Sequence, residues 1–100
     1  MRWIKTGKVS DIDEGKSQII NADSKELALF KIAGKIYALE NTCPHRGGPL
    51  GEGYLEGSEV TCPWHAWAFD VKTGACQTMP EMKQPVFKVK NEHDELFVEI

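Results

Sequence analysis

The chain has 100 residues, of which 41% are hydrophobic and 27% are charged, and its formal net charge is −3. This length and composition fit one globular domain with a modest core and exclude a disordered chain. The mild acidity excludes a basic nucleic-acid binder. No apolar run approaches a membrane helix of roughly 20 residues or the core of a signal peptide. We therefore expect a single domain over residues 1–100, located in the cytoplasm, with no membrane or nucleic-acid partner.

Alternating apolar and polar residues predict strands in the first part of the chain. A short strand is expected at Arg2–Gly7, followed by a turn and a second strand that includes Ser17–Ile20. The runs Glu26–Ile32 and Lys35–Asn41 alternate around a short glycine turn at 33–34. Two alternating runs around such a turn are typical of a β-hairpin.

The end of the chain predicts a second hairpin. Its strands are expected at Val86–Lys90 and Glu95–Ile100, joined by the polar turn 91–94, because both runs alternate with a period of two. His93 lies in this turn, and we expect it to be exposed to solvent without a role in the site.

The middle of the chain, residues 42–85, is rich in Gly and Pro, with short strands expected around Val60 and Phe69. A long segment with so little hydrophobic spacing needs something besides apolar packing to hold it. We therefore predict a small all-β domain. The two end hairpins form its base, and the middle forms a site built from loops.

Two near-copies of one phrase in this middle segment contain two of the three cysteines and two of the three histidines. Cys43 and His45 form C-x-H, and Cys62 and His65 form C-x-x-H after sixteen intervening residues. Structural disulfides are rare in the cytoplasm, and three cysteines cannot all pair, so a metal or redox role is favoured. Cys76 is the spare cysteine, and we expect a small, partly buried side chain with no ligand role.

Three chemistries could use the four residues of the two phrases. A zinc finger takes two cysteines from one element and two histidines from another, whereas here each loop supplies one of each. A Cys–His nucleophile dyad needs only one of each and leaves the duplication unexplained. A two-iron cluster, with both cysteines on one iron and both histidines on the other, uses all four.

The stretches "CPHRGG" and "CPWHAWAFDVKTG" resemble the cluster-binding signature of Rieske-type iron–sulfur proteins, and residues 2–100 resemble the small Rieske ferredoxins in length and strand order. The resemblance implies a Rieske-type antiparallel β-sandwich with one [2Fe-2S] cluster and an inserted cluster-binding subdomain at about 42–80. It implies that Cys43 and Cys62 bind the inner iron, and that His45 and His65 bind the outer iron near the surface. Gln77–Pro80 would then match a third loop that covers the cluster, or else form an ordinary connector.

The ligands determine the charge and therefore the potential of such a cluster. Two ferric ions, two sulfides and two thiolates sum to zero, whereas four thiolates would give −2. An electron adds more easily to the neutral cluster than to one of charge −2. Rieske potentials accordingly lie at about −150 to +300 mV. High-potential members of the family carry a loop disulfide and hydroxyl donors to the sulfides. The matching positions here are Gly48 and Trp64 for the cysteines, and Trp67 and Phe69 for the hydroxyls, so we expect a low potential.

A cluster saturated by four protein ligands has no open position for a substrate, so we expect an electron carrier and not an enzyme. The resemblance implies a monomeric ferredoxin that accepts one electron from a flavin-dependent ferredoxin reductase and passes it to a terminal oxygenase. The alternative is a fixed small Rieske subunit of an NADH-dependent nitrite reductase, because the first loop is also similar to that of such subunits. A third interpretation is a Rieske-fold binding module that carries zinc.

Overall fold

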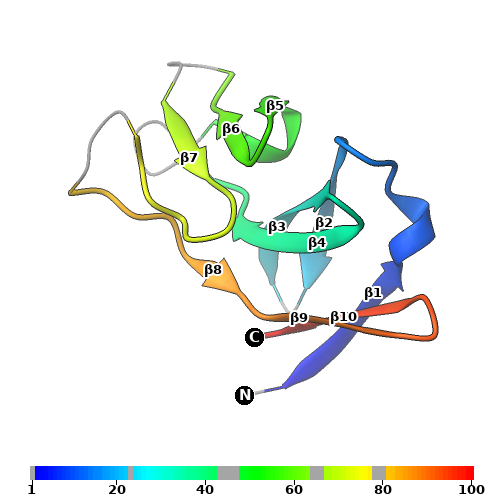
Figure 1. The fold of residues 1–100 in the computed structure, drawn as a ribbon. Helices are drawn as coiled ribbons and strands as arrows, with labels where there is room; N and C mark the ends of the chain where they lie inside the picture. Colours follow the sequence, from blue (N-terminus) through cyan, green and yellow to red (C-terminus); the bar gives the residue numbers. More distant parts are fainter. Residues whose placement is uncertain (1, 23, 43–47, 64–66, 78–80) are drawn as a thin grey trace.

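A computed structural model describes residues 2–22, 24–42, 48–63, 67–77 and 81–100 (Figure 1). In this part of the chain the regular structure consists of strands and two short 3₁₀ helices. In chain order the elements are β1 (Trp3–Lys8), η1 (Val9–Asp11), β2 (Ser17–Ala22), β3 (Lys25–Ile32), β4 (Lys35–Glu40), η2 (Leu50–Glu52), β5 (Tyr54–Glu56), β6 (Glu59–Thr61), β7 (Ala68–Asp70), β8 (Val86–Phe87), β9 (Val89–Glu92) and β10 (Glu95–Glu99).

The strands form three antiparallel sheets in the orders β1-β10-β9, β2-β3-β4-β8 and β5-β6-β7. In Figure 1 the four-stranded sheet lies in the middle, with β5-β6-β7 at one end and β1-β10-β9, which carries both chain termini, at the other. The predicted all-β class is confirmed. The predicted base of two hairpins is divided between two sheets: the hairpin of β3 and β4 lies in the central sheet, and the hairpin of β9 and β10 pairs with β1. The sheet β1-β10-β9 is called the base below.

Two core clusters lie on opposite faces of the central sheet, because successive side chains of a strand point to opposite faces. Ala28 and Phe30 of β3 enter one cluster, whereas Leu27 and Leu29 enter the other. The first cluster joins the central sheet to β5-β6-β7 and includes Leu50, Val60, Cys62, Phe69, Val71 and Cys76. The second joins it to the base and includes Val9, Ile12, Ala22, Ala38, Leu96 and Val98. The apolar run of β3 is therefore buried on both sides.

The first predicted hairpin is present as β3 and β4, paired from Leu27↔Glu40 to Ile32↔Lys35 around the two-residue turn. The second prediction was partly wrong. The run expected at Val86–Lys90 is divided at Lys88 into β8, which pairs with β4, and β9, which pairs with β10. The turn of this hairpin is also shorter than predicted, because the pairing continues to Glu95↔Glu92.

No helix among the described residues is long and apolar enough to cross a membrane.

Candidate metal centre

Cys62 is the one predicted ligand that the described residues include, since Cys43, His45 and His65 lie outside them. It follows β6 directly and is 1% exposed, packed in the cluster that contains Val60 and Phe69. The next residue, Pro63, is exposed. The chain therefore passes from the core to the surface at the start of the second phrase.

The loop that carries Cys62 and His65 is closed at its base. Thr61 of β6 pairs with Ala68 of β7, and the N–H of Cys62 donates to the carbonyl oxygen of Trp67 at 2.7 Å. Residues 62–67 thus form a short connection between two paired strands. Cys62 lies at the start of this connection, and the sequence position of His65 falls within it.

The loop that carries Cys43 and His45 is closed in a similar way. An isolated antiparallel bridge pairs Thr42 with Pro49, and the N–H of Leu50 donates to the carbonyl oxygen of Asn41 at 2.8 Å. The side chain of Asn41 is 1% exposed and reinforces this closure. Its Oδ1 accepts from the N–H of Gly51 at 2.7 Å, and its Nδ2 donates to Glu26 Oε1 at 2.7 Å.

Gln84 holds the same loop from the other side. Its side chain is 1% exposed, and Nε2 donates to the carbonyl oxygens of Glu40 at 2.5 Å and Thr42 at 2.7 Å. The N–H of Glu40 donates to the carbonyl of Pro85, but proline has no N–H to return the bond. The amide of Gln84 supplies the missing donor.

The approach of Gln84 depends on a glycine at position 74. Gly74 has φ +82°, and a Cβ there would lie 2.1 Å from the carbonyl oxygen of Gln84. The N–H of Gln84 donates to the carbonyl oxygen of Gly74 at 2.7 Å. Any side chain at position 74 would therefore push the segment that contains Gln84 away from the first loop.

The third loop begins beside the second. The N–H of Gln77 donates to the carbonyl oxygen of Ala68 at 2.7 Å, and Phe69 forms a bridge with Cys76. Cys76 is 3% exposed and belongs to the core cluster, so it is buried more completely than the partly buried side chain predicted. Of the predicted covering segment Gln77–Pro80, only Gln77 is described, and it is exposed.

The hairpin of β5 and β6 brings the first and second loops together. Tyr54 pairs with Thr61, so the chain that leaves the first loop returns to the start of the second. Gly53 allows the strands to approach closely, because a Cβ at this position would lie 2.2 Å from the carbonyl oxygen of Thr61. The two closed loops are therefore neighbours, and each carries the sequence position of one cysteine and one histidine.

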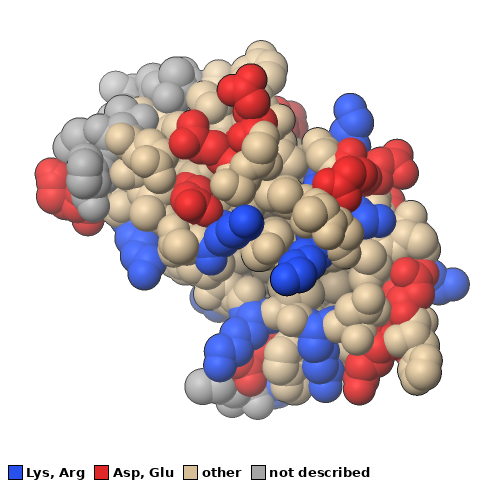
Figure 2. All heavy atoms as spheres, in the orientation of Figure 1, with Lys and Arg blue, Asp and Glu red and all other residues tan. Residues whose placement is uncertain are grey.

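The described residues around the two loops include an apolar core cluster and an acidic surface on the sheet β5-β6-β7. Phe69 is fully buried beneath the second loop, and Trp67 packs partly buried against the same cluster. On the sheet β5-β6-β7, Glu59 pairs directly with Glu56 on one side and Asp70 on the other. Figure 2 shows Asp and Glu side chains gathered over this end of the molecule.

Asn41 and Gln84 are functional positions that the sequence did not reveal, because both are polar residues in irregular segments. One signal for Gln84 was present. Pro85 leaves a strand without a donor, and an adjacent amide side chain can supply that donor.

The sequence positions of two cysteines and two histidines fall in two loops whose described ends are brought together by the β5–β6 hairpin, and this is the donor set of an iron–sulfur cluster with mixed ligands. This donor set fits a [2Fe-2S] cluster, with the buried thiol position nearest the core. The family described as the Rieske [2Fe-2S] domain matches residues 2–93, and the chain belongs to this family. It accordingly has one Rieske-type [2Fe-2S] cluster.

Similar proteins indicate which kind of Rieske protein the chain is. The chain is 42% identical over 80 residues to the ferredoxin component of the naphthalene 1,2-dioxygenase system of Pseudomonas putida, covering 80% of this chain and 77% of that protein. It is 34% identical to the corresponding component of Pseudomonas aeruginosa, covering 99% and 96%. Its fold matches a chain in the complex of reduced oxygenase and oxidised ferredoxin of carbazole 1,9a-dioxygenase, with a TM-score of 0.89, 33% identity and coverage of 96% and 91%.

These relatives make the chain a ferredoxin, an electron carrier that is not itself an enzyme. They are named as components of dioxygenase systems, and they do not favour the alternative of a fixed subunit of a nitrite reductase.

Proposed function

We propose that this ferredoxin transfers single electrons from a flavin-dependent ferredoxin reductase to a terminal oxygenase. The observation that carries the proposal is the likeness, over 96% of the chain, to a protein solved in a complex of oxygenase and ferredoxin. The curated relatives, named as ferredoxin components of dioxygenase systems, support the same pair of partners. When bound, the cluster supplies one reversible one-electron step.

We further propose that Cys43 and Cys62 bind the inner iron and that His45 and His65 bind the outer iron. The burial of Cys62 beside an exposed Pro63 supports this order, because the chain leaves the core between the cysteine and the histidine. The pairing of Tyr54 with Thr61 brings the described ends of the two loops together, which supports their assignment to one cluster. Cys62 packs in an apolar cluster of buried residues, which supports its assignment to the inner iron.

The domain proposal is a single unit over residues 1–100 with a cluster-binding subdomain at about 42–80. The sheet β5-β6-β7 supports it, because this sheet has its own strand pairing and shares one core cluster with the central sheet. We also propose a monomer in the cytoplasm. Among the described residues, the exposed large hydrophobics are Trp3, Tyr54 and Val86, which is a small set for a permanent interface.

The ligand assignment is tested by matched alanine variants of the purified holoprotein. Cys62→Ala should abolish the visible absorption and the EPR signal of the reduced cluster, whereas Cys76→Ala, which is also buried, should retain both. His45→Ala and His65→Ala should lose the Rieske spectrum, and His93→Ala should keep it. Iron and sulfide analysis should give two of each per chain. A Rieske signal that survives either loop histidine substitution would refute the assignment.

The partner proposal is tested by turnover in a reconstituted dioxygenase system. Product formation by the oxygenase should depend on the ferredoxin and should stop with Cys62→Ala. Gel filtration should give a monomer. A carrier that the reductase reduces but that no oxygenase of this class reoxidises would contradict the proposal.

A further inference from the structure

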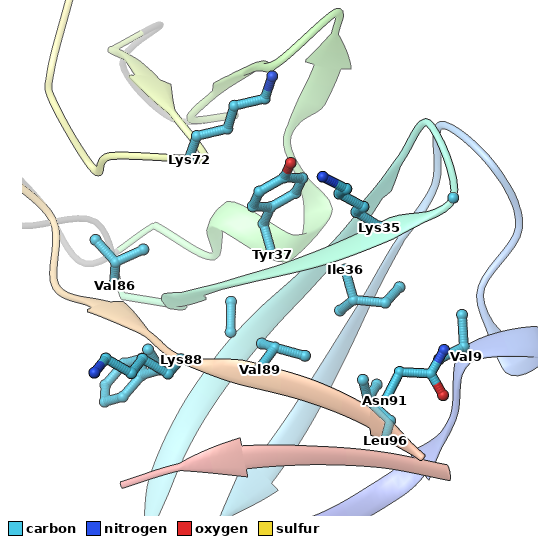
Figure 3. A pocket seen from close by; sticks show the side chains of 13 residues that line it. Val9, Lys35, Ile36, Tyr37, Lys72, Val86, Lys88, Val89, Asn91 and Leu96 are labelled. Carbon is cyan, nitrogen blue, oxygen red and sulfur yellow. The ribbon is translucent and has the colours of Figure 1, made fainter. Parts of the chain in front are cut away.

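A pocket of about 570 Å³ opens between the central sheet and the base. This volume lies in the usual range of small-molecule sites, about 300–1,000 Å³. Its apolar wall includes Ile36 of β4, Val86 of β8, and Val89 of β9, with Leu96 of β10 at its depth (Figure 3). Of these four, Leu96 is fully buried and Val86 is 39% exposed, so apolar surface is open to solvent here.

The pocket exists because the two sheets separate along β4. β8 has only two residues, and they pair with Ala38 and Leu39. After Lys88 the chain joins the other sheet, where β9 pairs with β10. Among the described residues, the part of β4 from Lys35 to Tyr37 therefore has no strand partner on this side.

The charge of the pocket is opposite to that of the whole protein. Lys35, Lys72 and Lys88 line it, and the lining includes no Asp or Glu, whereas the chain has a net charge of −3. None of the three lysines forms an ion pair with a described residue. Figure 2 shows Lys and Arg side chains across the middle of this face.

Two of these lysines gather around one phenol. Figure 3 shows Lys35, Lys72 and Tyr37 on the same side of the pocket, and Lys72 Nζ lies 5.9 Å from the centre of the Tyr37 ring. Two carboxylates near these lysines accept hydrogen bonds from the backbone: Glu14 accepts from the N–H of Gly34, the residue before Lys35, and Asp70 accepts from the N–H of Lys72.

We propose that this pocket binds a small organic carboxylate with an aromatic or aliphatic body. The carboxylate lies between the ammonium groups of Lys35 and Lys72, within reach of the Tyr37 hydroxyl, and the apolar body covers Ile36 and Val86. The ammonium groups attract the anion, and burial of its apolar body adds affinity in proportion to the area removed from water. This site is separate from the electron-transfer function.

The test is a titration of the oxidised holoprotein with 4-phenylbutanoate, followed by two-dimensional ¹H–¹⁵N NMR. Saturable shifts are expected at the amides of 35–38 and 86–89. The neutral 4-phenylbutanamide should bind at least about tenfold more weakly because it lacks the charge. Inorganic phosphate should also bind more weakly, because it lacks the apolar body. Absence of saturation up to about 10 mM 4-phenylbutanoate, or equal affinity for the amide, would overturn the proposal.

Matched variants separate a built site from general attraction to lysine. The double variant K35Q/K72Q should weaken binding about tenfold, whereas K16Q/K25Q, which makes the same charge change on exposed lysines outside the pocket, should change it by less than about twofold. Equal losses in the two double variants would refute the site. The visible spectrum of the cluster should be unchanged in both, so a failure of binding is distinguishable from a failure of the electron-transfer proposal.

Discussion

Replacement of Gln84 with Met should destabilise the protein by about 1–3 kcal/mol. Met keeps the length and the methylene groups of the Gln side chain, so little cavity forms, but it removes both hydrogen bonds of Nε2. The carbonyl of Glu40 then has no donor, because its strand neighbour Pro85 has no N–H. A buried acceptor left unsatisfied costs about 1–3 kcal/mol. The carbonyl of Thr42 loses its bond as well, but Thr42 is exposed, so water can replace the donor there and the estimate counts the Glu40 carbonyl alone.

The measurement is urea unfolding of the holoprotein, followed by circular dichroism and by the visible absorption of the cluster. With a urea dependence of about 2 kcal/mol per molar, the midpoint should fall by roughly 0.5–1.5 M. Cluster absorption should also bleach faster, because Thr42 directly precedes the proposed ligand Cys43. The control is Gln18→Met on β2, where the glutamine is only half buried.

The reasoning fails if Gln84→Met unfolds within about 0.5 kcal/mol of the wild type, the range of ordinary surface substitutions. It also fails if the control loses as much stability as Gln84→Met. In either case the amide would not be the donor that holds the first loop closed.

Three other predictions concern charge. Glu59→Lys should stabilise the protein by about 0.5–1 kcal/mol, because Glu59 lies opposite Glu56 and Asp70 and the lysine turns both like-charge pairs into opposite-charge pairs. A gain in thermal midpoint that does not shrink with added salt would contradict this. The pKa of Glu14 is held below its usual 4.5, first by the hydrogen bond from the N–H of Gly34 and then by that from Ala33. A group whose pKa is lower in the folded than in the unfolded protein stabilises the fold above its unfolded pKa, and this stability is lost as the pH falls through the folded pKa. The unfolding midpoint of Glu14→Gln should therefore depend less on pH below about pH 4.5 than the midpoint of the wild type. Protein-film voltammetry should give a potential near the bottom of the Rieske range, about −150 mV, and a clearly positive value at neutral pH would count against it.

The fold could be predicted where the determinants are local. Alternation around a short turn was sufficient for the hairpin of β3 and β4, and the residue pattern of Arg2–Gly7 was sufficient for β1. Both features depend on side chains within a few residues of each other. The sequence therefore contained the information that the prediction needed.

The assignment of a strand to one sheet or another could not be predicted in the same way. Alternation through Val86–Lys90 is continuous, but β8 and β9 belong to different sheets. The pattern reports which side chains are buried and not which strand lies beside them. The partner of β8 is β4, more than forty residues earlier in the chain, and no local signal specifies a pairing at that distance.

The same difference between local and distant determinants applies to the candidate metal centre. The two phrases give the ligand types and their spacing, and the ligand assignment stays a prediction that spectroscopy of the variants can test. The sequence did not show what closes the loops. Asn41 binds the Glu26 carboxylate and the Gly51 N–H, and Gln84 binds carbonyl oxygens more than forty residues earlier in the chain. A polar residue in an irregular segment carries no mark of such partners.

The structure explains why sixteen residues separate His45 from Cys62. They include η2 and the strands β5 and β6, which run outward and return, so that Tyr54 pairs with Thr61 just before the second phrase. A shorter segment could not complete this hairpin. A longer one would keep the pairing only by lengthening the turn at its far end, because Gly53 must stay against the carbonyl of Thr61. The spacing of the motif is therefore a property of the hairpin as much as of the metal, and insertions should be tolerated at the exposed turn at Gly57 but not between Gly53 and Tyr54.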